Sequence, residues 1–130
     1  MKYKMGEFKM NFDNRSKVPI YLQIAFTLRE KILKGNLKPD EQMPSIRVLA
    51  KKMQVNPNTI KKAYRVLEEQ NYLKSLSTRG TFVTNELDEI KEKRKKASFE
   101  AIHLETRELK NMGVSLRTIL EGIEKKWKVL

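Results

Sequence analysis

Two short helical segments lie only about three residues apart in the middle of this chain, and that spacing constrains its fold more than any other feature. Leu49 and Met53 supply the inward face of a short helix expected over about residues 45–53. Asn56 is a favourable helix N-cap, and Pro57 suits a first helical position, so another helix is expected to begin there. Such close spacing is typical of a helix-turn-helix, whose second helix is presented to the major groove of DNA.

Basic charge is concentrated around this motif. The 130 residues include 28 Lys and Arg against 16 Asp and Glu, a formal net charge of +12. Residues 1–85 carry 17 basic and 7 acidic side chains, whereas residues 86–130 carry 11 and 9. The window Met43–Leu67 has six basic residues and no acidic one. A polyanionic partner is therefore expected, with nucleic acid favoured over an anionic membrane surface.

An apolar stripe predicts a further helix before the motif. Its members recur every four residues: Ile20, Ile24, Leu28 and Ile32. With Gly35 as a stop signal, this helix is expected over about residues 19–34. Residues 1–17 lack sustained periodicity, so they are expected to form an extended or partly disordered N-terminal arm.

Two strand-like segments follow the motif. Tyr72–Leu76 and Thr81–Thr84 flank the turn Ser77–Gly80, which predicts a β-hairpin. Arg79 stands beside Gly80 at its tip. A basic residue next to a glycine suits a wing that approaches the DNA backbone closely.

The last 45 residues predict two more helices. One is expected from Glu86 to about Asn111, capped by Asn85, and the other follows Gly113 with Ser115 as its cap. So short a segment cannot bury two apolar helical faces alone, so a homodimer is expected. The residues expected to form its interface are Leu104, Leu116, Ile119, Leu120, Ile123 and Trp127.

Several ordered segments between residues 18 and 84 carry a family resemblance. They include Pro19-Ile20-Tyr21, Met43-Pro44-Ser45-Ile46-Arg47-Val48-Leu49-Ala50, Val55-Asn56-Pro57-Asn58-Thr59-Ile60 and Gly80-Thr81-Phe82-Val83. Together they resemble the DNA-binding domain of the gluconate-repressor (GntR) family. The Asn-Pro-Asn-Thr opening of one helix and the short two-helix tail resemble the YtrA-like subfamily. Many relatives have Arg where Pro57 stands and Gly where Asn71 stands, so base contacts do not transfer as a set.

The resemblance implies a mainly α fold with a small β-hairpin: an N-terminal arm over residues 1–17, a winged helix-turn-helix domain over 18–85 and a helical dimerisation or effector tail over 86–130. It also implies a dimeric, sequence-specific transcriptional regulator, usually a repressor, that binds a palindromic (inverted-repeat) operator. Members of the subfamily are often linked to transporter operons. The operator, the regulated genes and any small-molecule effector cannot be read from these residues.

The expected DNA contacts come from three places. Arg47 matches the family's contact arginine in Pro-Ser-x-Arg, and its guanidinium can grip a phosphate or a guanine edge. Asn58 and Thr59 open the recognition helix and suit base edges, while Ser45 combines a helix cap with a phosphate contact. The full expected set is Ser45, Arg47, Asn58, Thr59, Lys61, Lys62, Arg65, Thr78, Arg79 and Gly80.

Simpler interpretations remain open for these positions. Surface ion pairing, helix capping and an ordinary charged hairpin are the alternatives. Among the basic residues of the recognition helix, Lys61 is expected to face the groove most directly, because Lys62 and Arg65 point partly sideways. The basic run Lys91–Lys96 is interpreted as a solvated turn of a helix.

Enzymatic chemistry finds no support in the sequence. It has no cysteine and one histidine, His103, and it lacks a Ser-His-acid set, a phosphate-binding glycine loop and a metal-ligand pattern. We therefore expect no enzyme, no metal and no cofactor. Without a signal-peptide or membrane-spanning pattern, a soluble cytoplasmic protein is expected. A winged-helix RNA-binding or protein-interaction adaptor is the main alternative, and an anionic-membrane binder is a weaker one.

Overall fold

The computed structural model describes residues 8–130, which form five α-helices and one two-stranded antiparallel sheet. The elements in chain order are α1 (Ile20–Lys34), α2 (Ile46–Met53), α3 (Pro57–Glu69), β1 (Leu73–Leu76), a 3₁₀ turn (Ser77–Arg79), β2 (Gly80–Val83), α4 (Leu87–Asn111) and α5 (Leu116–Trp127). The expected fold class, mainly α with a small hairpin, is confirmed. The chain divides after Ile90 into two compact units.

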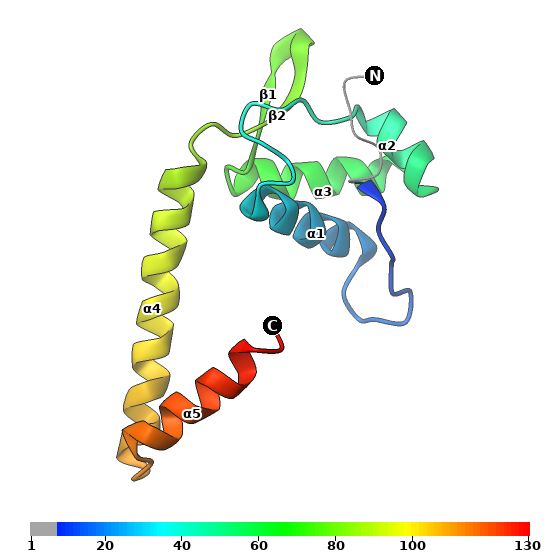
Figure 1. The fold of residues 1–130 in the computed structure, drawn as a ribbon. Coiled ribbons are helices and arrows are strands. Elements are labelled where there is room, and N and C mark those ends of the chain that lie inside the picture. The colour runs from blue at the N-terminus through cyan, green and yellow to red at the C-terminus, as the bar shows by residue number, and fades with distance from the viewer. Residues whose placement is uncertain (1–7) are drawn as a thin grey trace. The chain divides into compact units, whose positions relative to one another are not determined.

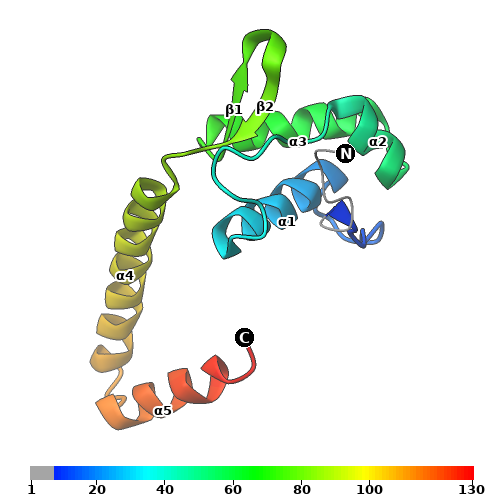
Figure 2. The ribbon, with the colours of Figure 1, turned by 45° about the horizontal axis from the view of Figure 1, so that its top comes forward.

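The core of the first unit lies between α1 and α3. Within this unit α3 runs across the middle, with α1 on one side and the hairpin projecting from the other (Figures 1 and 2). The most deeply buried side chains include Ile24, Leu28 and Ile32 of the predicted stripe, Leu49 of the predicted inward face, and Ile60 and Leu67 of α3. Burial of these stripes fixes which faces of α2 and α3 stay in solvent.

Local capping signals set the helix ends of the motif. The Ser45 hydroxyl accepts a hydrogen bond from the Val48 N–H at 3.2 Å, and the Asn56 side-chain oxygen accepts one from the Asn58 N–H at 2.8 Å. Gly35 ends α1 with a left-handed φ of 85°. At these three positions, the residue type correctly predicts where a helix begins or ends.

The N-terminal arm, as far as it is described, packs against the first unit. Phe8 is only 2% exposed, and Met10 and Phe12 pack on the same core. The Gln23 side chain holds the segment further along, accepting from the Asp13 N–H at 2.9 Å and donating to the Asp13 carbonyl at 3.0 Å. Side chains two residues apart in an extended chain point to the same side, so these three apolar side chains can all face the core. Residues 1–7 of the expected arm lie outside the described residues.

The start of α4 belongs to the first unit. Leu87, the first residue of α4, is buried in the core of that unit, which extends to Ile90. The hydroxyl of Thr84 accepts a hydrogen bond of 3.1 Å from the N–H of Glu86, the residue just before α4.

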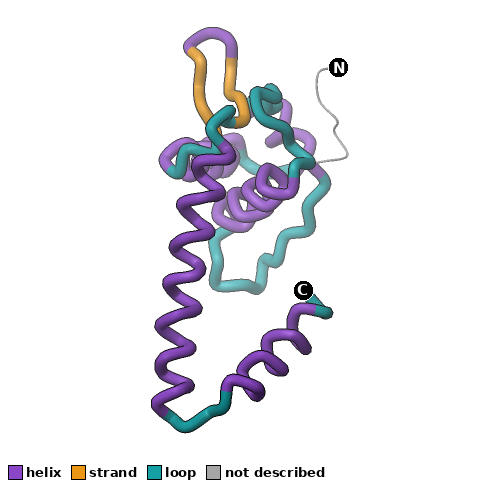
Figure 3. Tube along the Cα trace, turned by 60° about the vertical axis from the view of Figure 1, so that its left-hand side comes forward, coloured by secondary structure: helices purple, strands orange, loops and turns teal. Residues whose placement is uncertain are grey.

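The second unit is a helical hairpin made by α4 and α5. Gly113 turns the chain with a φ of 83°, and Ser115 caps α5 by accepting from the Thr118 N–H at 3.2 Å. Figure 3 shows the two helices joined by this short turn as the arms of a V. No residue from 91 to 130 is buried. Among residues 8–130, none of the helices combines the length and the hydropathy that a membrane span requires.

Candidate nucleic-acid interface

The helix-turn-helix pair is held together by a buried contact. The Tyr64 hydroxyl, from the middle of α3, donates a hydrogen bond of 2.7 Å to the Pro44 carbonyl, just before the α2 cap. The apolar faces of α2 and α3 are both buried, which leaves Ser45 and Arg47 exposed at the start of α2. The predicted contact residues of α2 are therefore presented to solvent.

The exposed face of α3 gathers the expected recognition residues. Four of them, Asn58, Lys61, Lys62 and Arg65, line one shallow hollow of about 230 Å³. Lys61 and Arg65 also line a second hollow, together with Ser75 and Thr81 of the wing strands. The recognition helix and the wing thus form the walls of a single concave region.

A third hollow of about 360 Å³ connects the wing to the start of α2. Its lining includes Gln42, Ser45, Arg47 and Gly80. This hollow and the one beside α3 share three lining residues, Ile46, Tyr64 and Thr81. The surface is therefore continuous from α2 across α3 to the wing, and most of the predicted contact residues lie on or beside it.

Two of the predicted residues are less available than the others. The Lys62 ammonium lies 5.7 Å from the centre of the Tyr21 ring, so this side chain leans toward α1. Thr59 is half-buried, and its N–H donates to the Asn56 carbonyl within the helix start. Arg65 lines the same two hollows as Lys61.

The wing tip is a single 3₁₀ turn, visible as the helical segment at the end of the hairpin in Figure 3. Thr78 and Arg79 are exposed there. Gly80 has φ 112° and ψ −161°, a backbone conformation open essentially only to glycine. The tip is thus a tight, specified turn that offers one arginine to solvent.

The charge on this surface is almost entirely positive. Within residues 8–130, none of Arg47, Lys61, Arg65 and Arg79 takes part in an ion pair. Glu68 is the acidic residue that lines the concave surface, and its carboxylate accepts a hydrogen bond of 2.8 Å from the Ser75 hydroxyl. Cationic side chains that are not ion-paired within the protein are suited to phosphate.

Sequence reasoning missed two residues of this surface. Val48 is 43% exposed beside Arg47, where an apolar group suits a sugar or a thymine methyl. Gln42 joins the hollow between wing and α2, although it lies 37 residues from the wing residue that it contacts. Helical periodicity could have found Val48 on the outward face of α2. No local pattern marks Gln42.

Comparison with known proteins agrees with this geometry. A family model described as bacterial regulatory proteins, gntR family, matches residues 20–83. The HTH-type transcriptional regulator YhcF of Bacillus subtilis is 31% identical over 110 residues, which cover 85% of this chain and 91% of YhcF. The chain belongs to the GntR family. The HTH-type transcriptional repressor YtrA of Bacillus subtilis is 43% identical over 75 residues, 58% of each protein, so this match leaves much of YtrA uncovered.

Two solved structures of transcription factors resemble this fold. YtrA from Sulfolobus acidocaldarius, a GntR-family transcription factor, is 35% identical with a TM-score of 0.57, over 72% of this chain and 96% of that one. AraR(DBD) in complex with operator ORX1 is 30% identical with a TM-score of 0.52, over 58% of this chain and 93% of that one. The chain is thus a YtrA-like GntR regulator with a winged helix-turn-helix domain. GntR regulators are DNA-binding proteins rather than enzymes.

Proposed function

We propose that this chain is a homodimeric repressor that binds an inverted-repeat operator, with one winged helix-turn-helix domain on each half-site. The observation that carries the proposal is the continuous basic surface over α2, α3 and the wing. In this arrangement α3 lies in the major groove, with Asn58 and Lys61 toward base edges. Arg47 grips a guanine edge or a phosphate, and Arg79 contacts phosphate or the minor groove.

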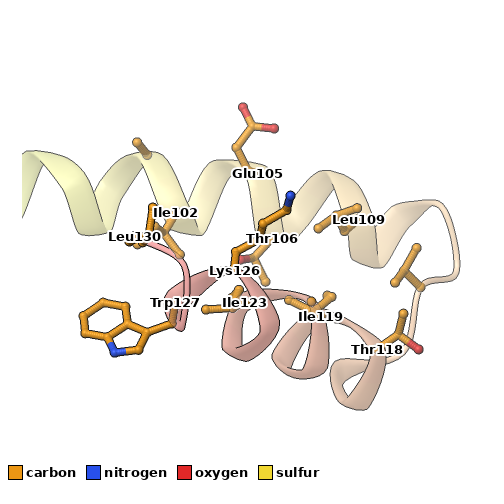
Figure 4. Close-up of a pocket in the computed structure, with 13 residues that line it drawn as sticks. Ile102, Glu105, Thr106, Leu109, Thr118, Ile119, Ile123, Lys126, Trp127 and Leu130 are labelled. Carbon is orange, nitrogen blue, oxygen red and sulfur yellow. The ribbon is translucent and has the colours of Figure 1, made fainter.

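The tail supports dimerisation through its uncovered apolar surface. Between α4 and α5 lies an open groove of about 630 Å³, toward which Ile119 and Ile123 point from α5 (Figure 4). Trp127 is 73% exposed, and four more of the expected interface residues, Leu104, Leu116, Leu120 and Ile123, are exposed as well, while Ile119 is half-buried. Monomeric soluble proteins rarely leave so many large apolar side chains together in water. A second copy covers them in the proposed dimer.

Selection of bound genomic fragments, followed by a mobility-shift assay, tests the operator proposal. We expect an inverted repeat whose half-sites are about one helical turn, or roughly 34 Å, apart. If each half neutralises about six phosphates, the logarithm of affinity falls with the logarithm of salt at a slope of about −5 per half-site. Equal binding of random duplex, or stronger binding of structured RNA at the same salt, would contradict the proposal.

The regulated genes follow from the same selection. Transporter genes beside the bound fragments are the expected outcome for a YtrA-like repressor acting in the cytoplasm. An effector, where one acts, is placed in the dimer interface, where it changes the distance between the two recognition helices. Spin labels on the two copies of α3 measure that distance. An unchanged distance in the presence of a ligand that releases the operator contradicts this mechanism.

A further inference from the structure

The segment before α2 forms a third extended element along the wing. The Val83 N–H donates to the Glu41 carbonyl at 2.8 Å, the Asp40 N–H to the Val83 carbonyl at 2.9 Å, and the Met43 N–H to the Thr81 carbonyl at 2.8 Å. Strand β2 therefore has hydrogen-bonded partners on both edges, with β1 on the other side. Backbone bonds therefore hold the base of the wing, and the Lys74 ammonium of β1 adds a bond of 3.0 Å to the Asp40 carboxylate of the third element.

The tip of the wing extends beyond this ladder, and a single side chain reaches it from the third element. The Gln42 side-chain amide donates from Nε2 to the Arg79 carbonyl at 3.1 Å. The carbonyl belongs to the last residue of the 3₁₀ turn, directly before Gly80. The bond therefore holds the backbone that carries the Arg79 side chain.

The fit around Gly80 makes this contact specific. A Cβ atom added to Gly80 would lie 3.0 Å from Gln42 Nε2, closer than side-chain atoms normally approach. The glycine leaves the space that the Gln42 amide occupies, and its φ of 112° shapes the turn that presents the Arg79 carbonyl. Gln42 and Gly80 act as a matched pair at the wing tip.

Gln42 also lies directly beside the start of α2. Only Met43 and Pro44, both buried, separate it from the Ser45 cap. Two backbone segments expected to contact DNA, the α2 start and the wing tip, thus meet at this one side chain. Together with Arg47 and Gly80, this residue lines one hollow.

We propose that Gln42 is a positioning residue for DNA binding: its amide holds the wing tip so that Arg79 meets DNA in register with Arg47. The proposal rests on the proposed function in one respect, the contact between Arg79 and DNA. It adds that this contact depends on a residue outside the DNA-contacting set, on a segment that belongs neither to the helix-turn-helix nor to the hairpin.

The test is a double-mutant cycle in the full-length protein. Gln42→Met keeps the length and neutrality of the side chain but cannot donate a hydrogen bond. We expect it to weaken binding to a selected operator fragment by about two- to tenfold, the range for one neutral hydrogen bond. Arg79→Ala is expected to weaken binding and to reduce the salt slope by about one. In the Arg79→Ala background, Gln42→Met is expected to change affinity no further.

A measurement in the absence of DNA tests the positioning role of Gln42 separately from the proposed contact between Arg79 and DNA. Backbone ¹⁵N relaxation of residues 77–80 is expected to report increased motion in Gln42→Met, and none in Gln70→Met, which makes the same change at an exposed position after α3. If the tip stays rigid in Gln42→Met, or if that variant weakens binding equally with and without Arg79, the positioning role is wrong. If the tip loosens but Arg79→Ala binds normally, the wing contact in the proposed function is wrong and the positioning role for DNA binding falls with it.

Discussion

The hydroxyl of Tyr64 and the carbonyl of Pro44 lie 2.7 Å apart in the interior of the DNA-binding unit. This hydrogen bond ties the middle of the recognition helix to the chain just before α2. Both residues are buried, so water cannot replace either partner. The relative placement of the two helices depends on a polar contact as well as on apolar packing.

Removing the donor should therefore destabilise the domain. Tyr64→Phe leaves the buried Pro44 carbonyl without its partner, and we expect the free energy of unfolding to fall by about 1–3 kcal/mol. Urea denaturation measures the change. Tyr21→Phe, at a half-buried tyrosine of α1, is the control and should change stability by less than about 0.5 kcal/mol. Equal losses in the two variants would show that the Tyr64 bond has no special role.

The end of α3 offers a stabilising substitution. Asn71 has a left-handed φ of 66°, its N–H donates to the Glu68 carbonyl, and the Tyr72 N–H donates to the Leu67 carbonyl. This is the Schellman pattern, in which glycine is the commonest residue at the left-handed position. We expect Asn71→Gly to raise the free energy of unfolding by about 0.5 kcal/mol and Asn71→Ala to lower it by about 1 kcal/mol. Thermal unfolding in which alanine is the more stable of the two would contradict this.

The packed arm predicts a large effect on the stability of the fold. Phe8 is almost fully buried, so Phe8→Ala is expected to cost about 3–5 kcal/mol of folding stability. Phe26→Ala, at a phenylalanine of α1 that is 40% exposed, should cost far less. Chemical denaturation compares the two. A neutral Phe8→Ala would mean that the arm contributes nothing to the core.

Local and long-range contacts account for what the sequence could and could not predict. Ser45, Asn56 and Gly35 act within three residues of themselves, so their capping roles follow from residue type and position. The burial of Phe8 and the bond from Gln42 to the wing require the folded unit to bring distant segments together. The short alternation of Phe8, Met10 and Phe12 does not say which surface the arm packs on, and no local pattern marks the Gln42 bond. For the same reason the outward faces of α2 and α3 were predictable, while the connection between wing and α2 was not.

We expect Arg47 to contribute to the preference for operator DNA over random duplex, in addition to supplying positive charge. Arg47→Ala is expected to weaken operator binding by about 1–3 kcal/mol if the guanidinium reads a guanine. Arg47→Lys keeps the charge but loses the fork, so it should keep binding to random duplex while losing preference for the operator. Arg29→Ala removes the same charge from α1, where Arg29 stacks 5.0 Å from the Phe26 ring, and should leave discrimination intact. Full rescue by lysine would reduce Arg47 to a phosphate contact.

The tail tests the proposed dimer most directly. Leu120 is 55% exposed on α5, and in a self-associated tail it becomes buried. A carboxylate buried there without a partner costs several kcal/mol, so Leu120→Glu is expected to give a monomer in sedimentation velocity. The control is Met112→Glu, an exposed position in the turn between α4 and α5 that is outside the predicted interface.

Loss of the dimer should also weaken operator binding. Two linked domains bind the second half-site at a high effective concentration, which strengthens binding by about 10²–10⁴-fold over one domain. We expect Leu120→Glu to bind a fragment with two half-sites more weakly than the parent protein by a factor of that order. Its affinity for a fragment with a single half-site should equal that of the parent protein. Unchanged thermal unfolding of the winged domain shows that the variant is folded. A Leu120→Glu protein that remains dimeric would place the interface elsewhere than on this face of α5.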